Sequence, residues 1–237
     1  TGNNWNTPQT VTVTGVNDSD RDKNQAYQIS LSASSQLTDN PDVTTVAGSG
    51  SSGSTNATGT SAKFSYPRGI TSDGTNLYVA DRNNNTIRKI VISTGAVTTL
   101  AGSPGSSGST NGTGTSARFS SPRGIVTDGT NLYVSDRSNH MIRKIVIATG
   151  AVTTLAGSTS YGSTDGTGTS ARFYYPEGIT TDGTNLYVGD SSNHTIRKIV
   201  IATGVVTTIA GSPGSSGSTN GTGTSARFKY PHGITTD

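Results

Sequence analysis

Two histidines have side chains of a type that can bind a metal ion. His140 and His194 occupy matching places, each after an asparagine and separated by one residue from Ile-Arg-Lys, and Asn85 stands at the same place earlier in the chain. A zinc centre needs at least three protein ligands that converge on one point. Because the two histidines sit in equivalent parts of a repeated sequence, we expect them to lie apart. We interpret them as turn residues that pack beside a connection between strands.

An acidic turn near the start of the chain is the second candidate. Asp18, Asp20 and Asp22 alternate along it, a spacing that can present several carboxylates to Ca²⁺. The full signature of a calcium loop is not present. The turn is therefore either a calcium site or a solvated turn, and we expect no other cofactor.

Composition limits the function classes. The 237 residues include no cysteine, which excludes disulfides, thiolate metal sites and cysteine catalysis. Lys+Arg 17 against Asp+Glu 14 gives a formal charge of +3. This charge is spread thinly, so we expect no nucleic-acid partner. No apolar run reaches the roughly 18 residues of a membrane span.

A tandem repeat organises most of the chain. Pro67, Pro122, Pro176 and Pro231 follow one another at intervals of 55, 54 and 55 residues. The segment 103–119 recurs letter for letter at 212–228. Three copies are full, and a fourth stops at "GITTD". Either the sequence is a window from a longer polypeptide, or partial rings complete one another between chains.

Each copy predicts four antiparallel strands, which in the second copy are 124–128, 132–136, 141–147 and 151–157. Asp-Gly and Thr-Gly pairs between them are turn signals, and the third strand is rich in β-branched residues. No stretch has the apolar period of a helix, so helices should be scarce. Tandem four-stranded antiparallel units are typical of propeller blades. The predicted fold is an all-β propeller of such blades.

A polar insert follows the fourth strand of each copy and ends in an aromatic residue. It is either an ordered loop whose aromatic enters the core or a disordered outer loop, and its fixed length favours the ordered loop. The aromatics are Phe64, Phe119, Phe173 and Phe228.

The repeat resembles the NHL repeat of six-bladed β-propellers. The resemblance lies in F-x-x-P-x-G-I, D-G-x-N-L-Y-V-x-D-x-x-N-x-x-I-R-K-I and G-x-V-T-T-L-A-G, and it covers about residues 42 to 237. The element "GTGTSARF" is similar to bacterial secreted members. The resemblance implies an extracellular or cell-surface propeller that presents loops to protein or glycan partners.

Residues 1–40 differ from the repeat. Two alternating segments, 10–14 and 26–32, flank the acidic turn. They resemble the closing hairpin of Calx-β or cadherin-like β-sandwich domains, which often bind calcium in such turns. We therefore predict the C-terminal part of a sandwich domain at 1–40 and an incomplete set of propeller blades at 41–237.

An arginine recurs in the third predicted strand of each copy, and an aspartate ends the second. We interpret them as ion pairs between neighbouring blades, since the planar guanidinium suits a buried carboxylate. The arginines are Arg88, Arg143 and Arg197. Their expected partners are Asp81, Asp136 and Asp190, or else Asp73, Asp128 and Asp182.

The copies differ most usefully beside each proline. The residues before it are Tyr66, Ser121, Tyr175 and Tyr230, and those after it are Arg68, Arg123, Glu177 and His232. Blade entry loops commonly line the mouth of a central channel. We therefore predict that a partner binds these residues, with neutral surface drift as the alternative.

No nucleophile is paired with a base in this sequence, so we expect no enzyme. The predicted function is a non-catalytic extracellular scaffold for interaction or adhesion. One alternative is a self-associating structural subunit of a filament or surface layer. The other is a metal-dependent lyase or hydrolase whose site lies in blades outside this sequence.

Overall fold

The computed structural model describes residues 11–12, 28–29 and 43–236 of the chain. The chain divides into two compact units, Thr1–Thr44 and Thr45–Asp237. In the first unit, β1 (Val11–Thr12) pairs antiparallel with β2 (Gln28–Ile29), inside the two segments predicted as a hairpin. Asp18, Asp20 and Asp22 lie outside the described residues, so the calcium interpretation stays a prediction.

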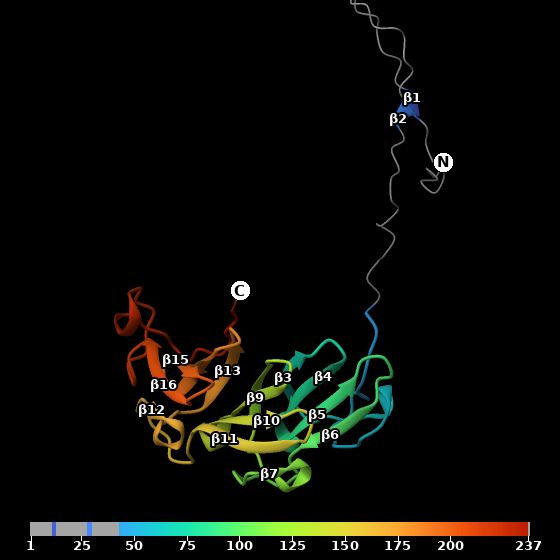
Figure 1. Cartoon of the computed structure of the whole chain (residues 1–237), viewed down its shortest axis with the longest axis horizontal. Helices are drawn as coiled ribbons and strands as arrows, with labels where there is room; N and C mark the ends of the chain where they lie inside the picture. Colours follow the sequence, from blue (N-terminus) through green and yellow to red (C-terminus); the bar gives the residue numbers. More distant parts are fainter. Residues whose placement is uncertain (1–10, 13–27, 30–42, 237) are drawn as a thin grey trace, which may run out of the picture. The chain divides into compact units, whose positions relative to one another are not determined.

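The second unit contains three antiparallel sheets, which Figure 1 shows side by side. The first comprises β3 (Pro67–Ser72), β4 (Asn76–Asp81), β5 (Thr86–Val91) and β6 (Val97–Ala101), in that order. The second comprises β8 (Pro122–Thr127), β9 (Asn131–Asp136), β10 (Met141–Val146), β11 (Ala151–Gly157) and, at its edge, β7 (Gly112–Thr113). The third comprises β13 (Pro176–Thr181), β14 (Asn185–Asp190), β15 (Thr195–Val200), β16 (Val205–Ala210) and, at its edge, β12 (Gly166–Thr167).

Helical structure among the described residues is limited to single 3₁₀ turns. Four stand in the polar inserts: η1 (Gly59–Ser61), η3 (Gly114–Ser116), η5 (Gly168–Ser170) and η7 (Gly223–Ser225). Three join the second strand of a sheet to the third: η2 (Arg82–Asn84), η4 (Arg137–Asn139) and η6 (Ser191–Asn193). No described helix has the length and apolar character needed to cross a membrane. The predicted all-β fold of four-stranded sheets is confirmed.

The turn between the first two strands of each sheet forms where Asp-Gly predicts it. In the second sheet, the backbone N–H of Asp128 donates to the carbonyl of Asn131 (3.2 Å). The Asp128 carboxylate in turn accepts from the N–H groups of Thr130 (2.8 Å) and Asn131 (2.6 Å). The aspartate satisfies the turn's donors and thereby fixes the hairpin.

The core lies between neighbouring sheets. Tyr78 and Ile87 of the first sheet and Leu132 and Ile145 of the second belong to one buried cluster. A second cluster joins the second sheet to the third. Each sheet packs through apolar side chains against the next, which is the arrangement of propeller blades.

The polar inserts are ordered, as their fixed length predicted. In the insert before β8, Gly102 donates to the carbonyl of Gly114 (3.1 Å), and Gly114 donates to that of Gly150 (2.9 Å). Phe119 and Phe173 are fully buried and belong to the two clusters between sheets. The alternative of disordered outer loops is wrong.

Candidate functional site

The residues that follow the four prolines come together around one cavity. Its volume is about 470 Å³, and its lining repeats the sequence x-Gly-Ile four times. The first positions are Arg68, Arg123, Glu177 and His232. The first three stand at the start of the innermost strands, where β8 contacts both β3 and β13, and His232 has the matching place in the fourth copy. Residues about 55 apart in sequence thus come together. The residues before the prolines, which were predicted for the same opening, are not part of this lining.

Glycine after Arg68, Arg123 and Glu177 allows the backbone of neighbouring copies to approach closely. A Cβ on Gly124 would lie 2.2 Å from the carbonyl oxygen of Glu177. A Cβ on Gly69 would lie 2.4 Å from that of Arg123. Backbone therefore packs directly on backbone, and the side chains of the preceding residues are gathered at the cavity.

Glu177 is the electrostatic centre of the cavity. Its side chain is 5% exposed. Its carboxylate accepts from Arg137 Nε (2.9 Å), from Arg123 Nη1 and, at the same oxygen as Arg123, from His232 Nδ1. Burial raises the pKa of Glu177, but hydrogen bonds from His232 and Arg137 and the charge of Arg123 outweigh it, so the pKa is lowered. Glu177 is thus an anion held by three donors.

Arg137 was not among the residues predicted for this site. It belongs to η4 and reaches Glu177, 40 residues away in sequence. Its guanidinium also lies over the ring of Tyr175, 4.3 Å from the centroid, within cation–π range. Arg137 therefore connects the cavity to the aromatic residues beside it.

The residue before each proline has an uncommon backbone conformation. Tyr66, Ser121, Tyr175 and Tyr230 have φ of 51 to 52°, in the left-handed region that non-glycine residues seldom adopt. Ser121 N–H donates to Asn85 Oδ1 of the preceding sheet (2.9 Å). Tyr175 N–H donates in the same way to His140 Nδ1 (3.2 Å) and Tyr230 N–H to His194 Nδ1 (3.3 Å). These bonds hold the strained backbone in place.

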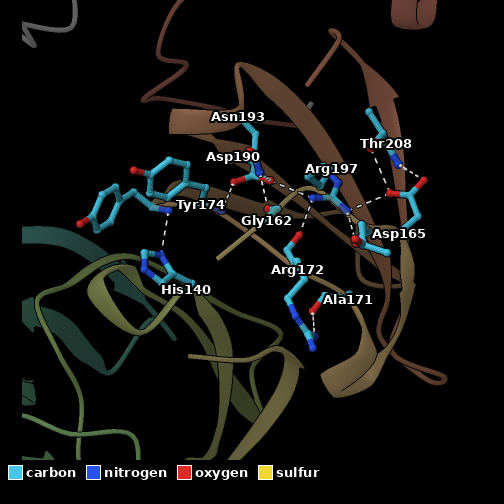
Figure 2. A network of polar contacts seen from close by, with 12 residues as sticks. His140, Gly162, Asp165, Ala171, Arg172, Tyr174, Asp190, Asn193, Arg197 and Thr208 are labelled. Carbon is cyan, nitrogen blue, oxygen red and sulfur yellow. Dashed lines mark hydrogen bonds and ion pairs between the residues drawn. The ribbon is translucent and has the colours of Figure 1, made fainter. Parts of the chain in front are cut away.

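His140 therefore joins neighbouring sheets, and His194 joins the third sheet to the fourth copy of the repeat. Both follow a 3₁₀ turn with φ near 60°, as does Asn85. Figure 2 shows His140 pointing toward the segment around Tyr174. Burial lowers the pKa of His140, and the charge of Arg137 lowers it further, which keeps the imidazole neutral and Nδ1 able to accept. The turn position was predicted, but the role between sheets was not.

The recurring arginines form their ion pairs within a sheet, so the expectation of pairs between blades is wrong. Arg143 Nη1 donates to Asp136 Oδ2 (2.8 Å) on the neighbouring strand. The pairs Arg88–Asp81 (2.9 Å) and Arg197–Asp190 (2.8 Å) repeat this geometry. Asp136 faces Met141 across the strand pair, and Arg143 lies two residues further on the same face. The diagonal neighbour in the same sheet is therefore within reach.

These pairs anchor the polar insert to its sheet. Arg143 also donates to the carbonyls of Arg118 (3.0 Å) and Thr110 (3.2 Å) and to Asn111 Oδ1 (2.8 Å). Figure 2 shows the third copy of the cluster, in which Arg197 bridges Asp190 and Asp165. All three arginines are fully buried. They serve the frame and do not face the cavity lining.

The aspartates proposed as alternative partners of the arginines lie instead in the turns between the first two strands of each sheet. Asp73, Asp128 and Asp182 accept from the hydroxyls of Tyr78 (2.7 Å), Tyr133 (2.8 Å) and Tyr187 (2.9 Å). Burial raises the pKa of Asp128, but hydrogen bonds from Asn131 and Thr130 outweigh it and lower the pKa.

Comparison with known proteins supports the fold and the repeat. Residues 64–90 match the family model described as NHL repeat. The chain is 34% identical over 160 residues to NHL repeat-containing protein 2 of Bos taurus, covering 61% of this chain and 22% of that protein. It is 34% identical over 148 residues to Protein SUPPRESSOR OF QUENCHING 1, chloroplastic, of Arabidopsis thaliana, covering 57% and 14%. The chain thus spans about a fifth or less of these curated relatives.

Solved structures share the architecture at low identity. An auxiliary nutrient binding protein from Bacteroides ovatus aligns with a TM-score of 0.57 at 20% identity, over 77% of this chain and 49% of that one. One from Bacteroides thetaiotaomicron aligns with a TM-score of 0.56 at 21% identity, over 71% and 42%. These structures support the propeller fold, and the family model and the curated relatives confirm the resemblance to NHL repeats.

Proposed function

We propose that this chain is a non-catalytic interaction scaffold that binds a protein or glycan partner at the cavity beside the prolines. One observation carries the proposal. The side chains that stay the same between copies are engaged in the frame, as the Arg143–Asp136 cluster is. The side chains that follow the prolines change between copies, and they line one cavity. A repeated frame with varied side chains at a single opening is suited to recognition.

The charge of the cavity favours an acidic partner. Three guanidinium groups, those of Arg68, Arg123 and Arg137, line the cavity or bind its one carboxylate, Glu177. The local excess of positive charge attracts carboxylate or sulfate groups.

The state of Glu177 argues for binding over catalysis. A general acid or base works best with a pKa near the operating pH. The pKa of Glu177 is lowered instead, and both carboxylate oxygens already accept hydrogen bonds. The carboxylate orients Arg123 and His232 for a ligand.

The location of the protein follows from the resemblance and the loops. We propose a bacterial secreted or cell-surface protein that acts in adhesion, with the 1–40 segment from a Calx-β or cadherin-like sandwich. The Gly-, Ser- and Thr-rich inserts and the resemblance of "GTGTSARF" to secreted members support this. Two proteins that share the fold are described as nutrient binding, which agrees with a binding role.

Binding to acidic polymers tests the proposal. The full chain is titrated with poly-L-glutamate and polygalacturonate, with dextran as the neutral comparison. We expect a salt-dependent complex with at least one acidic polymer, weakened at least tenfold in Arg68→Ala/Arg123→Ala. The control Arg118→Ala/Arg172→Ala removes the same charge, and both of its arginine side chains bond locally to loop carbonyls. Absence of any complex, or equal weakening in both double variants, would overturn the proposal.

A further inference from the structure

Three tyrosines cluster beside the cavity in the third copy of the repeat. The rings of Tyr161 and Tyr174 stack with centroids 4.5 Å apart, and those of Tyr174 and Tyr175 with centroids 5.0 Å apart. His140 meets Tyr175 at 4.7 Å and the other two rings at 5.7 Å. We call Tyr161, Tyr174 and Tyr175 the tyrosine patch.

The tyrosine patch is a departure from the repeat. Tyr161 occupies the place of Ser52, Ser107 and Ser216 in the other copies, and Tyr174 occupies that of Ser65, Ser120 and Lys229. The backbone N–H of Tyr174 donates to Asp190 (2.7 Å), just as Ser120 does to Asp136 (2.7 Å). The fold therefore needs only the backbone here. Two tyrosines that stack on each other stand where the first two copies have serine.

The hydroxyls of the tyrosine patch are not used by the frame. Tyr78, Tyr133 and Tyr187 each donate their hydroxyl to an aspartate. The hydroxyls of the patch make no hydrogen bond with the part of the chain that the structure describes. The Tyr161 residue is also 64% exposed, so a ligand can reach it. Tyrosine hydroxyls at interfaces commonly find a partner there. These three are free to bond a ligand.

Tyr175 of the patch is held by residues of the preceding copy, and Tyr161 follows three hydroxyl-bearing residues in its loop. Arg137 lies over Tyr175 at 4.3 Å, and His140 fixes the Tyr175 backbone. The residues before Tyr161 in the same loop are Ser158, Thr159 and Ser160, and the Ser158 hydroxyl is bonded to the Ser160 backbone. Rigid tyrosines give a large amphipathic contact at low entropic cost.

We propose that the tyrosine patch binds a saccharide chain. A pyranose ring has a face of C–H groups that packs on an aromatic ring and a rim of hydroxyls that bond to phenol, serine and threonine hydroxyls. The patch offers both kinds of group together. This site is distinct from the charged cavity, so it goes beyond the function proposed above.

A saccharide array tests the assignment. The full chain is applied to neutral and acidic oligosaccharides from plant, fungal and bacterial cell walls, with decaproline as the peptide probe. The test variant Tyr161→Ser/Tyr174→Ser restores residues that other copies already carry, so the fold is expected to tolerate it. The control Ile92→Ser removes a 42% exposed apolar side chain from the first copy. Thermal unfolding of each variant checks its folding.

We expect the wild type and Ile92→Ser to bind at least one oligosaccharide equally, and the double tyrosine variant to bind it at least tenfold more weakly. Three results would overturn the proposal: no saccharide bound by the wild type, equal binding by the double variant, or tyrosine-dependent binding of decaproline alone. Arg68→Ala/Arg123→Ala is measured on the same array. Its effect on acidic polymers reports on the cavity separately from the patch.

Discussion

Replacing Arg143 with methionine should destabilise the protein strongly. The change keeps an apolar side chain beside Phe119, whose ring lies 5.3 Å from the guanidinium, but removes all four hydrogen bonds of Arg143. Asp136 is then a fully buried carboxylate without a counter-charge. Breaking a buried pair in this way typically costs about 3–5 kcal/mol. For a chain of this size, that corresponds to a fall in Tm of about 6–20 °C.

A second variant separates the charge from the packing. In Asp136→Asn/Arg143→Met no unpaired buried charge remains, so most of the lost stability should return. Burial already raises the pKa of Asp136 to about 6 against the charge of Arg143, so the carboxylate is the unfavourable group once the arginine is gone. Asparagine avoids that burial of charge.

Thermal unfolding followed by circular dichroism measures both variants, with Lys144→Met as the control. Lys144 is the next residue on β10 and is only partly buried, so its replacement should change stability by less than about 0.5 kcal/mol. A Tm difference of ~2 °C corresponds to roughly 1 kcal/mol of stability for a chain of this size. The reasoning would therefore be refuted if the Tm of Arg143→Met lies within ~2 °C of that of the Lys144→Met control. It would also be refuted if the double variant is no more stable than Arg143→Met.

Two other changes test the contacts between sheets. In Gly124→Ala the new Cβ would lie 2.2 Å from the carbonyl oxygen of Glu177, so urea unfolding should show that the free energy of unfolding falls by about 3 kcal/mol. The control is Gly233→Ala, at the same repeat position. A Cβ there has no heavy atom within 4 Å, so the free energy of unfolding should not change. In His140→Asn the acceptor is retained, as Asn85 shows, and the titration is removed. Because the folded pKa of His140 is lowered, its contribution is complete above the unfolded pKa of about 6.5 and is lost as pH falls below it. Stability measured from pH 7 to pH 5 should therefore fall less in His140→Asn than in the wild type, and equal falls would contradict the role of Nδ1.

The sequence predicted the architecture because each copy carries its own local signals. The Asp128-Gly129 turn, the β-branched third strand and the recurring Phe119 all act within one copy or at its junction with the next. Repetition then fixes where the copies must pack. The grouping of Arg68, Arg123 and Glu177 around one cavity could be predicted in the same way, from their shared place beside the prolines.

The sequence did not show toward which sheet a given side chain points, and the contacts it missed depend on that. The sequence left Asp136 and Asp128 both open as partners of Arg143, and spacing alone does not say whether the partner lies in the same sheet or the next. Arg137 reaches Glu177 only because η4 lies beside the neighbouring inner strand. The role of His140 was visible in principle, since histidine and asparagine at that position share an sp² acceptor and tolerate positive φ.

The central claim is that the varied residues beside the prolines, and not the repeated clusters, carry the function. Hydrogen–deuterium exchange of the full chain, with and without a saturating acidic polymer that it binds, tests this most directly. The account predicts that new protection concentrates at the starts of β3, β8 and β13 and at residues 232–234, where the cavity lies. Protection confined to the outer strands β6, β11 and β16, with no change at Arg123 or Glu177, would contradict it.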